Sequence, residues 1–288
     1  MPITKGMIHK MKNRFKLLPV LCLILVTVVL LPSLTAFASE AAYPEVPVSF
    51  SGEDMNMESS PLLIESTTYV PLFEFCMAIG EAEVLRDGDL ETVAIAEMTI
   101  EAAVGNCYFT ANERYLFVPT LCRDIDGQIY VPIRPLSKVF GLAVLWDDDT
   151  RSVLLEPEND TIESGETFYD ETDVYWMSRI INAESGYEIM LGKIAVGHVV
   201  MNRVNSAQWP DTVYDVIFDN RYGIQFSPAY SGAINRDPND DSVIAAKLAL
   251  EGASVVGESI YFSATGLSSW ASRNRPFIIA IGNHSFFG

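Results

Sequence analysis

Glu184 is the residue whose type and position in this chain best suit acid–base chemistry. It follows an apolar helical pattern that includes Ile180 and Ile181, and it precedes Gly186, where that pattern breaks. A carboxylic acid in an apolar wall keeps its proton to higher pH, because burial disfavours the charged form. Such an acid can protonate the oxygen that leaves when a glycosidic bond is cleaved. The pattern therefore predicts that Glu184 is the catalytic acid, and then base, of a sugar-cleaving enzyme.

Glu188 is the second carboxylate near this position. Glycosidases that use water normally need two carboxylates, whereas a transglycosylase needs only one because a hydroxyl of the same sugar attacks. Glu188 lies beyond Gly186, so regular helical spacing from Glu184 is not expected. We expect Glu188 to order the loop or to contact the substrate, with a catalytic role as the alternative.

Five short motifs occur in a fixed order along the second half of the chain. They are RIINAE at 179–184, GKIAVG at 192–197, VMNRV at 200–204, QFS at 225–227 and IGNHSF at 281–286. Together they resemble the cell wall hydrolase family typified by the spore cortex-lytic enzyme SleB, over nearly all of 174–287. The resemblance implies a lysozyme-like catalytic fold and peptidoglycan as substrate. It also implies cleavage between N-acetylmuramic acid and N-acetylglucosamine, as a lytic transglycosylase in which the muramic C6 hydroxyl attacks.

Further residues of this half are candidates for substrate binding. An amide side chain can bind a sugar N-acetyl group, and an aromatic ring can pack beneath a sugar ring. Besides Glu188, we predict substrate contacts for Gln225, Phe226, Tyr261, Asn283 and His284. The alternatives are backbone bracing for the glutamine, core packing for the two aromatic residues and a structural hydrogen bond for the histidine.

The histidine and cysteine content disfavours metal and thiol mechanisms. The histidines are His9, His198 and His284, and the cysteines beyond residue 38 are Cys76, Cys107 and Cys122. A zinc amidase needs about three histidine or carboxylate ligands, and a cysteine peptidase needs its cysteine near a histidine. We therefore expect no metal and no cofactor. A hydrolytic N-acetylmuramidase, a peptidoglycan amidase and a non-catalytic wall-binding protein remain as alternatives.

The elements that must position these residues form a small helix-dominated α+β domain over 170–288. Predicted helices run from a cap at Asp173 to about Ala183, over 192–205, over 212–218, and from a cap at Asp241 to Leu250; extended segments cover 259–262 and 277–281. Ala195 and Gly197 are small enough to let another helix approach closely.

A repeated, β-rich unit fills the first half. Tyr69-Val70-Pro71 recurs 61 residues later as Tyr130-Val131-Pro132, and each copy continues into a short helical pattern and a hairpin signal. The pattern over about 61–156 resembles the copper amine oxidase N-terminal-like domain. Copper prefers imidazole ligands, and this stretch has no histidine. We interpret it as a non-catalytic module that holds the enzyme at the envelope.

Residues 1–38 have the features of a signal peptide. A basic start precedes the apolar run 17–31, and Ala36-Phe37-Ala38 supplies small residues for cleavage. The run is shorter than the ~20 residues of a spanning helix, so we expect no membrane span after cleavage and a secreted protein of the cell wall or spore envelope. The module then covers 39–156, a polar linker 157–169 and the hydrolase domain 170–288.

The charge of the chain is strongly negative. The formal net charge is −19, and Ser39–Tyr169 carries 25 acidic residues against 6 basic ones. This balance argues against nucleic acid or another anionic polymer as a partner. Peptidoglycan is the expected partner, and no pattern indicates an oligomeric state.

Overall fold

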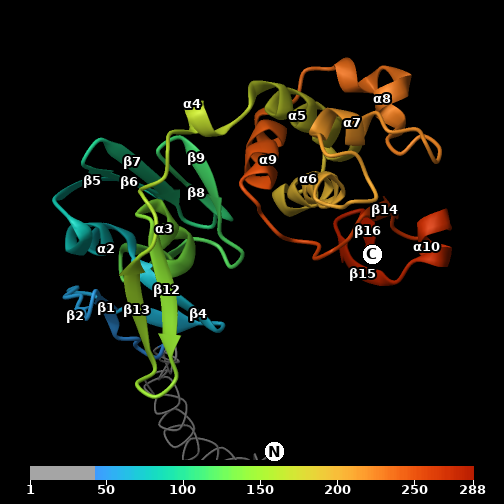
Figure 1. Ribbon diagram of the computed structural model, residues 1–288. Helices are drawn as coiled ribbons and strands as arrows, with labels where there is room; N and C mark the ends of the chain where they lie inside the picture. Colours follow the sequence, from blue (N-terminus) through green and yellow to red (C-terminus); the bar gives the residue numbers. More distant parts are fainter. Residues whose placement is uncertain (1–42) are drawn as a thin grey trace, which may run out of the picture. The chain divides into compact units, whose positions relative to one another are not determined.

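The computed structural model describes residues 43–288 (Figure 1). The predicted signal peptide lies outside the described residues. Among the residues described, no helix combines the length and apolar character needed to cross a membrane. The described chain is α+β: strands dominate up to residue 157, and helices dominate from residue 165 onward. The predicted fold class, with its β-rich first half and helix-rich second half, is confirmed.

Each copy of the repeat forms a strand, a helix and a hairpin. The first copy is β4 (Thr67–Pro71), α2 (Leu72–Ile79), β5 (Ala82–Asp87) and β6 (Leu90–Ile95), and the second is β11 (Gln128–Pro132), α3 (Ile133–Val139), β12 (Leu142–Asp147) and β13 (Ser152–Pro157). The copies meet where β4 and β11 pair antiparallel, with Val70 opposite Val131. Pro71 and Pro132 end these strands and precede the helices, because proline fixes φ near −65° and has no N–H for the ladder.

The remaining strands of this part extend three sheets. They are β1 (Val48–Phe50), β2 (Glu53–Asp54), β3 (Leu62–Ile64), β7 (Met98–Ala103), β8 (Tyr108–Ala111), β9 (Arg114–Phe117) and β10 (Arg123–Ile125). The strand orders are β12-β13-β1-β2, β10-β11-β4-β3 and β5-β6-β7-β8-β9. One apolar core, which includes Phe75, Phe109 and Leu136, joins the sheets to both helices.

Three helices form the centre of the second part. They are α5 (Glu171–Ser185), α6 (Met190–Val204) and α9 (Asp240–Leu250), which pack against one another (Figure 1). Around them lie α4 (Gly165–Phe168), α7 (Val213–Ile217), α8 (Ser227–Ser231), the 3-10 turn η1 (Ala233–Asn235) and α10 (Trp270–Asn274). A small sheet in the order β14-β16-β15 completes this part, from β14 (Tyr261–Ala264), β15 (Phe277–Ile281) and β16 (His284–Phe287).

Gly197 lets the three central helices approach closely. A Cβ at this position would lie 2.7 Å from the Cβ of Ala249 on α9 and 3.0 Å from Cδ1 of Ile181 on α5. Both distances are shorter than ordinary contacts, so only glycine fits without movement. The close approach predicted for Gly197 is confirmed, and it holds the half of α5 that carries Glu184.

The starts of two helices differ from the prediction. Asp170, and not Asp173, caps α5, because its carboxylate accepts hydrogen bonds from two N–H groups of the first turn. Asn239, and not Asp241, caps α9, because its side-chain oxygen accepts a hydrogen bond from the N–H of Ser242. In both places several cap-forming residues stand close together, and the residue with an extended backbone just before the helix takes the role.

Residues 157–169, predicted as a linker, are packed against the first part of the chain. The N–H groups of Glu158 and Asn159 both donate to the carbonyl of Gly141. Tyr169 is buried, and its hydroxyl accepts a hydrogen bond of 3.0 Å from the N–H of Tyr115. Although the segment is polar in composition, its backbone therefore forms hydrogen bonds with the rest of the chain. The domain boundary placed here stays a prediction.

Candidate active site

Glu184 lies in the last turn of α5 and lines a cavity of about 350 Å³. The cavity is formed by the end of α5, the following loop and a segment before α9: Asn182, Ala183, Glu184, Ser185, Gly186, Tyr187, Glu188, Ala233, Arg236, Asp237 and Asn239. Burial raises the pKa of Glu184 to about 7. Near neutral pH a large fraction of this carboxyl group is therefore protonated, as a general acid requires.

Asn239 joins the end of α5 to the start of α9. Its side-chain amide donates a hydrogen bond of 3.1 Å to the carbonyl of Gly186, and its N–H donates to Oδ1 of Asn182 at 3.3 Å. Its own Oδ1 accepts from the N–H of Ser242 at 2.9 Å and so caps α9. Because carbonyls at a helix end have no helical partner, this asparagine satisfies α5 and fixes the backbone on two sides of the cavity.

Glu188 connects the loop after α5 with the turn between β15 and β16. Its carboxylate accepts two hydrogen bonds from Asn283, one of 2.7 Å from the side-chain amide and one of 3.2 Å from the N–H. We call this pair the Glu188–Asn283 clasp. Hydrogen bonding by the Asn283 side chain lowers the pKa of Glu188, which keeps the carboxylate charged. The structure thus brings these two predicted residues together.

Two neighbours support the clasp. Gly282 has a φ of +56°, and a Cβ there would overlap the Glu188 carboxylate. The buried ammonium of Lys193 donates a hydrogen bond of 2.6 Å to the main-chain carbonyl of Glu188. The loop after α5 is therefore held at both its side chain and its backbone.

His284 follows the clasp on β16. Its ring meets that of Phe262 edge to face, with the centroids 5.4 Å apart, and its Nδ1 is buried without a hydrogen-bond partner among the described residues. Burial lowers the pKa of His284, while the charge of Glu188 acts in the opposite direction.

Gln225 and Phe226 do not line the Glu184 cavity. Phe226 is completely buried in the apolar core beside Phe262, so its ring has no surface for a sugar. The side-chain amide of Gln225 donates a hydrogen bond of 2.9 Å to the carbonyl of Gly223 in its own loop. Phe226 therefore packs in the core, and Gln225 braces the backbone of its own loop. Both contacts are the alternatives that the sequence left open.

Tyr261 lies at the other end of the small sheet. It pairs with Phe287, whereas Ala264 pairs with His284, so about 10 Å of strand separates it from the histidine. Its ring packs against Trp209 and Trp270, with centroids 6.0 and 5.5 Å away. The structure does not bring Tyr261 to Glu184.

Asp237 and Tyr187 line the cavity but were not singled out from the sequence. Asp237 accepts a hydrogen bond of 2.8 Å from Arg179, and the ring of Tyr187 is fully exposed. Asp237 is one of three aspartates within 237–241, and no spacing singles it out from the other two. Only the packing of η1 and α9 on α5 places it near Glu184.

Comparison with known families agrees with the two resemblances seen in the sequence. Residues 187–287 match the cell wall hydrolase family. Residues 49–155 match the copper amine oxidase N-terminal domain. Both predicted resemblances are confirmed. Glu184 lies just before residues 187–287, so the argument for a catalytic role of Glu184 rests on the geometry of its cavity.

Individual relatives match over the same share of the chain. A spore cortex-lytic enzyme of Bacillus cereus is 36% identical over 120 residues, which are 41% of this chain and 45% of the relative. Spore cortex-lytic enzymes of Oceanobacillus iheyensis and Bacillus subtilis are 36% and 29% identical, covering 42% and 38% of those proteins. The chain thus spans less than half the length of these relatives.

The solved catalytic domain of the germination-specific lytic transglycosylase SleB from Bacillus anthracis is also similar. It is 33% identical, and the alignment covers 44% of this chain and 100% of that domain with a TM-score of 0.39.

The donor set of the first part does not fit a copper site. Residues 49–155 contain no histidine. Its three cysteines, Cys76, Cys107 and Cys122, are buried free thiols, and burial raises the pKa of Cys76 and of Cys122 to about 12. Within residues 43–288 no group of three or more histidine, cysteine or acidic side chains is placed to hold a metal ion.

Proposed function

We propose that this protein cleaves peptidoglycan between N-acetylmuramic acid and N-acetylglucosamine, as a lytic transglycosylase in which Glu184 is the acid and then the base. The observation that carries the proposal is the Glu184 carboxyl group itself, half-buried at the wall of a cavity, with its pKa raised by desolvation to about 7. The match of 187–287 to the cell wall hydrolase family, and relatives named spore cortex-lytic enzymes, support peptidoglycan as the substrate.

The reaction needs one carboxyl group in two protonation states. Protonated Glu184 donates its proton to the glycosidic oxygen as the bond from that oxygen to the muramic C1 breaks. The resulting carboxylate then takes the proton of the muramic C6 hydroxyl as its oxygen forms a new bond to C1. The product is a 1,6-anhydromuramic end, and Glu184 regains its proton. A pKa near neutrality suits both steps, because neither proton transfer is strongly uphill.

Glu188 has a positioning role in this reaction. Both of its oxygens accept hydrogen bonds from Asn283, and it stays charged. We assign it the role of holding the loop that borders the cavity, so that Tyr187 and Glu184 keep their places.

Hydrolysis to a reducing end, as by an N-acetylmuramidase, is the second candidate. The observation in its favour is Asp237, an exposed carboxylate that lines the same cavity as Glu184. A hydrolase needs such a second carboxylate to activate water or to act as nucleophile.

Replacement of Glu184 tests the assignment. Glutamine keeps the shape but cannot donate an acidic proton, so Glu184→Gln should lower the release of fragments from purified peptidoglycan by roughly 10²–10⁴-fold. Glu258→Gln, a change at an exposed glutamate of the same part, is the matched control and should leave the rate unchanged. An unchanged rate for Glu184→Gln would remove this residue from the mechanism.

Mass spectrometry of the released fragments separates the candidates. Anhydromuramic ends support the transglycosylase and reducing muramic ends support the hydrolase. New free amino groups would show that the protein is an amidase. If no fragments are released from any peptidoglycan, the protein is a non-catalytic wall-binding protein.

We also propose export to the cell wall or spore envelope, where the substrate lies. The features of residues 1–38 support it. Sequencing of the mature N-terminus should find Ser39 as the first residue, and an uncleaved cell-associated chain would contradict the proposal.

A further inference from the structure

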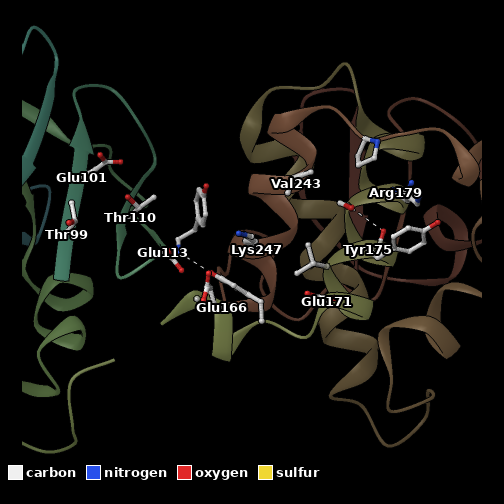
Figure 2. A pocket seen from close by; sticks show the side chains of 16 residues that line it. Thr99, Glu101, Thr110, Glu113, Glu166, Glu171, Tyr175, Arg179, Val243 and Lys247 are labelled. Atoms are coloured by element: carbon white, nitrogen blue, oxygen red, sulfur yellow. Dashed lines mark hydrogen bonds between the residues drawn. The ribbon is translucent and has the colours of Figure 1, made fainter. Parts of the chain in front are cut away.

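A second cavity, of about 1090 Å³, lies beside the Glu184 cavity. One wall comes from α5 and α9, through Tyr175, Arg179 and Lys247 among others. The facing wall comes from β7 and β8 of the first part, through residues such as Glu101 and Thr110 (Figure 2). We call this cavity the side groove.

Helix α5 joins the side groove to the catalytic cavity. Tyr175, Arg179 and Asn182 follow one another at spacings of four and three residues, so they lie on one face of the helix. Arg179 lines the side groove, and it holds Asp237, which lines the catalytic cavity. Asn182 on this face lines the catalytic cavity, and since a helix rises 1.5 Å per residue, Arg179 and Tyr175 lie about 4.5 and 10.5 Å along the axis from it. A polymer held at Glu184 is therefore within reach of the groove.

The two walls are fixed by a buried ion pair. The guanidinium of Arg114 on β9 donates hydrogen bonds of 2.9 and 2.7 Å to the carboxylate of Glu251, just after α9, and both side chains are more than nine-tenths buried. Lys138 reaches the same carboxylate at 2.7 Å, and Arg114 also lies over the ring of Phe168. The groove is thus preformed, so a ligand does not bear the entropic cost of assembling it.

The side groove offers charges of both signs. The ammonium of Lys247 lies 5.2 Å from the ring centres of Tyr115 and Tyr169, which hold it at the wall. Arg179 provides a second cation, with an Nε that is buried and has no partner among the described residues. Exposed carboxylates also line the groove: Glu101 and Glu113 come from the facing wall, Glu166 from α4 and Glu171 from α5. Uncharged sugars do not need such a lining, whereas a zwitterionic peptide finds partners for both of its charges.

We propose that the side groove binds the stem peptide of the peptidoglycan strand whose sugars occupy the catalytic cavity. This inference rests on the proposed function. The stem peptide is attached to the muramic sugar at the cleaved bond and carries carboxylates together with the ammonium of its diamino acid. Lys247 and Arg179 receive the carboxylates, and the glutamates of the facing wall receive the ammonium. The enzyme therefore prefers strands that retain their peptides over bare glycan.

Two matched substrates test the proposal: uncross-linked peptidoglycan strands with their stem peptides, and the same strands after an amidase has removed the peptides. Lys247→Ala and Tyr175→Ala in the full chain should raise KM for the peptide-bearing strands about fivefold to tenfold, with kcat within about twofold. KM for the peptide-free strands should not change. Arg273→Ala, which removes an exposed cation of α10 outside the groove, is the control and should affect neither substrate.

Binding to a chain that cannot cleave separates this inference from the proposed function. In the Glu184→Gln background, affinity for peptide-bearing strands should fall when Lys247→Ala is added and should recover with Lys247→Arg. That result supports the groove even if the wild-type chain cleaves no glycosidic bond. An equal loss of affinity for both substrates would place glycan in the groove and overturn the proposal. No loss for either substrate, in variants whose thermal unfolding matches the wild type, would overturn it as well.

Discussion

At the scale of single residues, the proposed reaction uses the carboxyl group of Glu184 twice: it donates a proton as the acid and then accepts one as the base. Burial at the end of α5 raises its pKa to about 7. Since the acid form starts the reaction, kcat/KM should be highest below pH 7 and fall as pH rises through 7. A pH profile of fragment release checks this, and a flat profile up to pH 9 would contradict it.

The same group makes stability depend on pH. Its pKa is raised from the ordinary 4.5 to about 7 in the folded chain, so between these values the folded state holds a proton that the unfolded state has lost. The free energy of unfolding therefore decreases as pH rises from 4.5 to 7, by about 3 kcal/mol from this group. Glu184→Gln should be more stable than wild type at pH 8 by up to about 3 kcal/mol, and equal to it at pH 4. Urea unfolding at the two pH values measures the difference, with Glu258→Gln as the control.

At the scale of elements, the Glu188–Asn283 clasp holds the loop after α5 against the β15–β16 turn. Glu188→Ala removes both hydrogen bonds of the clasp, and Asn283→Ala removes the one from the side-chain amide. The double variant should therefore lose little more than Glu188→Ala alone. The coupling expected in the free energy of unfolding is about 1–2 kcal/mol. kcat/KM should fall by roughly tenfold in each variant, while the midpoint of the pH profile stays near 7 because Glu184 is untouched. Additive losses, or a moved midpoint, would show that the clasp is not a positioning device.

The packing of α6 on α9 and α5 gives a second prediction at this scale. Gly197→Ala puts a methyl group 2.7 Å from the Cβ of Ala249, and overpacking of this kind costs about 1–3 kcal/mol of the free energy of unfolding. Alanine favours a helix by about 1 kcal/mol over glycine, so the net loss should be about 0–2 kcal/mol. Chemical denaturation measures it. Measured against Ala249→Gly alone, Gly197→Ala should cost less, because the contact with Ala249 is gone and only the 3.0 Å approach to Ile181 remains. An undiminished loss would mean that the contact with Ala249 is not the cause.

At the scale of the whole molecule, Glu251 is a buried residue that joins the first and second parts of the described chain. Its carboxylate pairs with both Arg114 and Lys138, and its side chain is 3% exposed. Removing one partner of a buried pair leaves an uncompensated charge, so Glu251→Gln should lower the free energy of unfolding by about 3–5 kcal/mol. Thermal unfolding of the full chain, followed by calorimetry, measures this loss.

A surface ion pair provides the matched comparison. Arg123 and Glu65 are 3.3 Å apart, with Glu65 67% exposed, and such pairs contribute about 0–1 kcal/mol. Glu65→Gln should therefore shift the transition only slightly. Equal effects of the two changes would show that burial of the Arg114–Glu251 pair has no special weight.

Much of the local structure could be predicted from the letters alone. The apolar periodicity identified the helices around Glu184, and the repeated Tyr-Val-Pro segments identified the unit whose two copies pair at Val70 and Val131. Small residues on α6 indicated close helix packing, which Gly197 shows. These features depend on neighbours in the sequence, so short windows contain the information. Helix starts were less accurate, because Asp170 and Asp173 are both good caps and only the backbone decides between them.

The candidate site was predicted less completely, since its members come together from distant segments. A motif singled out Glu184, but its raised pKa exists only because folding buries it. Burial in the core also removed Phe226 from the list of sugar contacts. The strand pairing of β14 with β16 places Tyr261 at the far end of its sheet from His284. Asn239 and Asp237 reached the cavity only through the packing of α9 and η1 on α5. By itself the sequence determined which groups are present and how each segment folds. The tertiary structure decided which groups are buried from solvent, which are hydrogen-bonded and which share a cavity. The reason is that desolvation and hydrogen bonding depend on atoms that are distant in the chain.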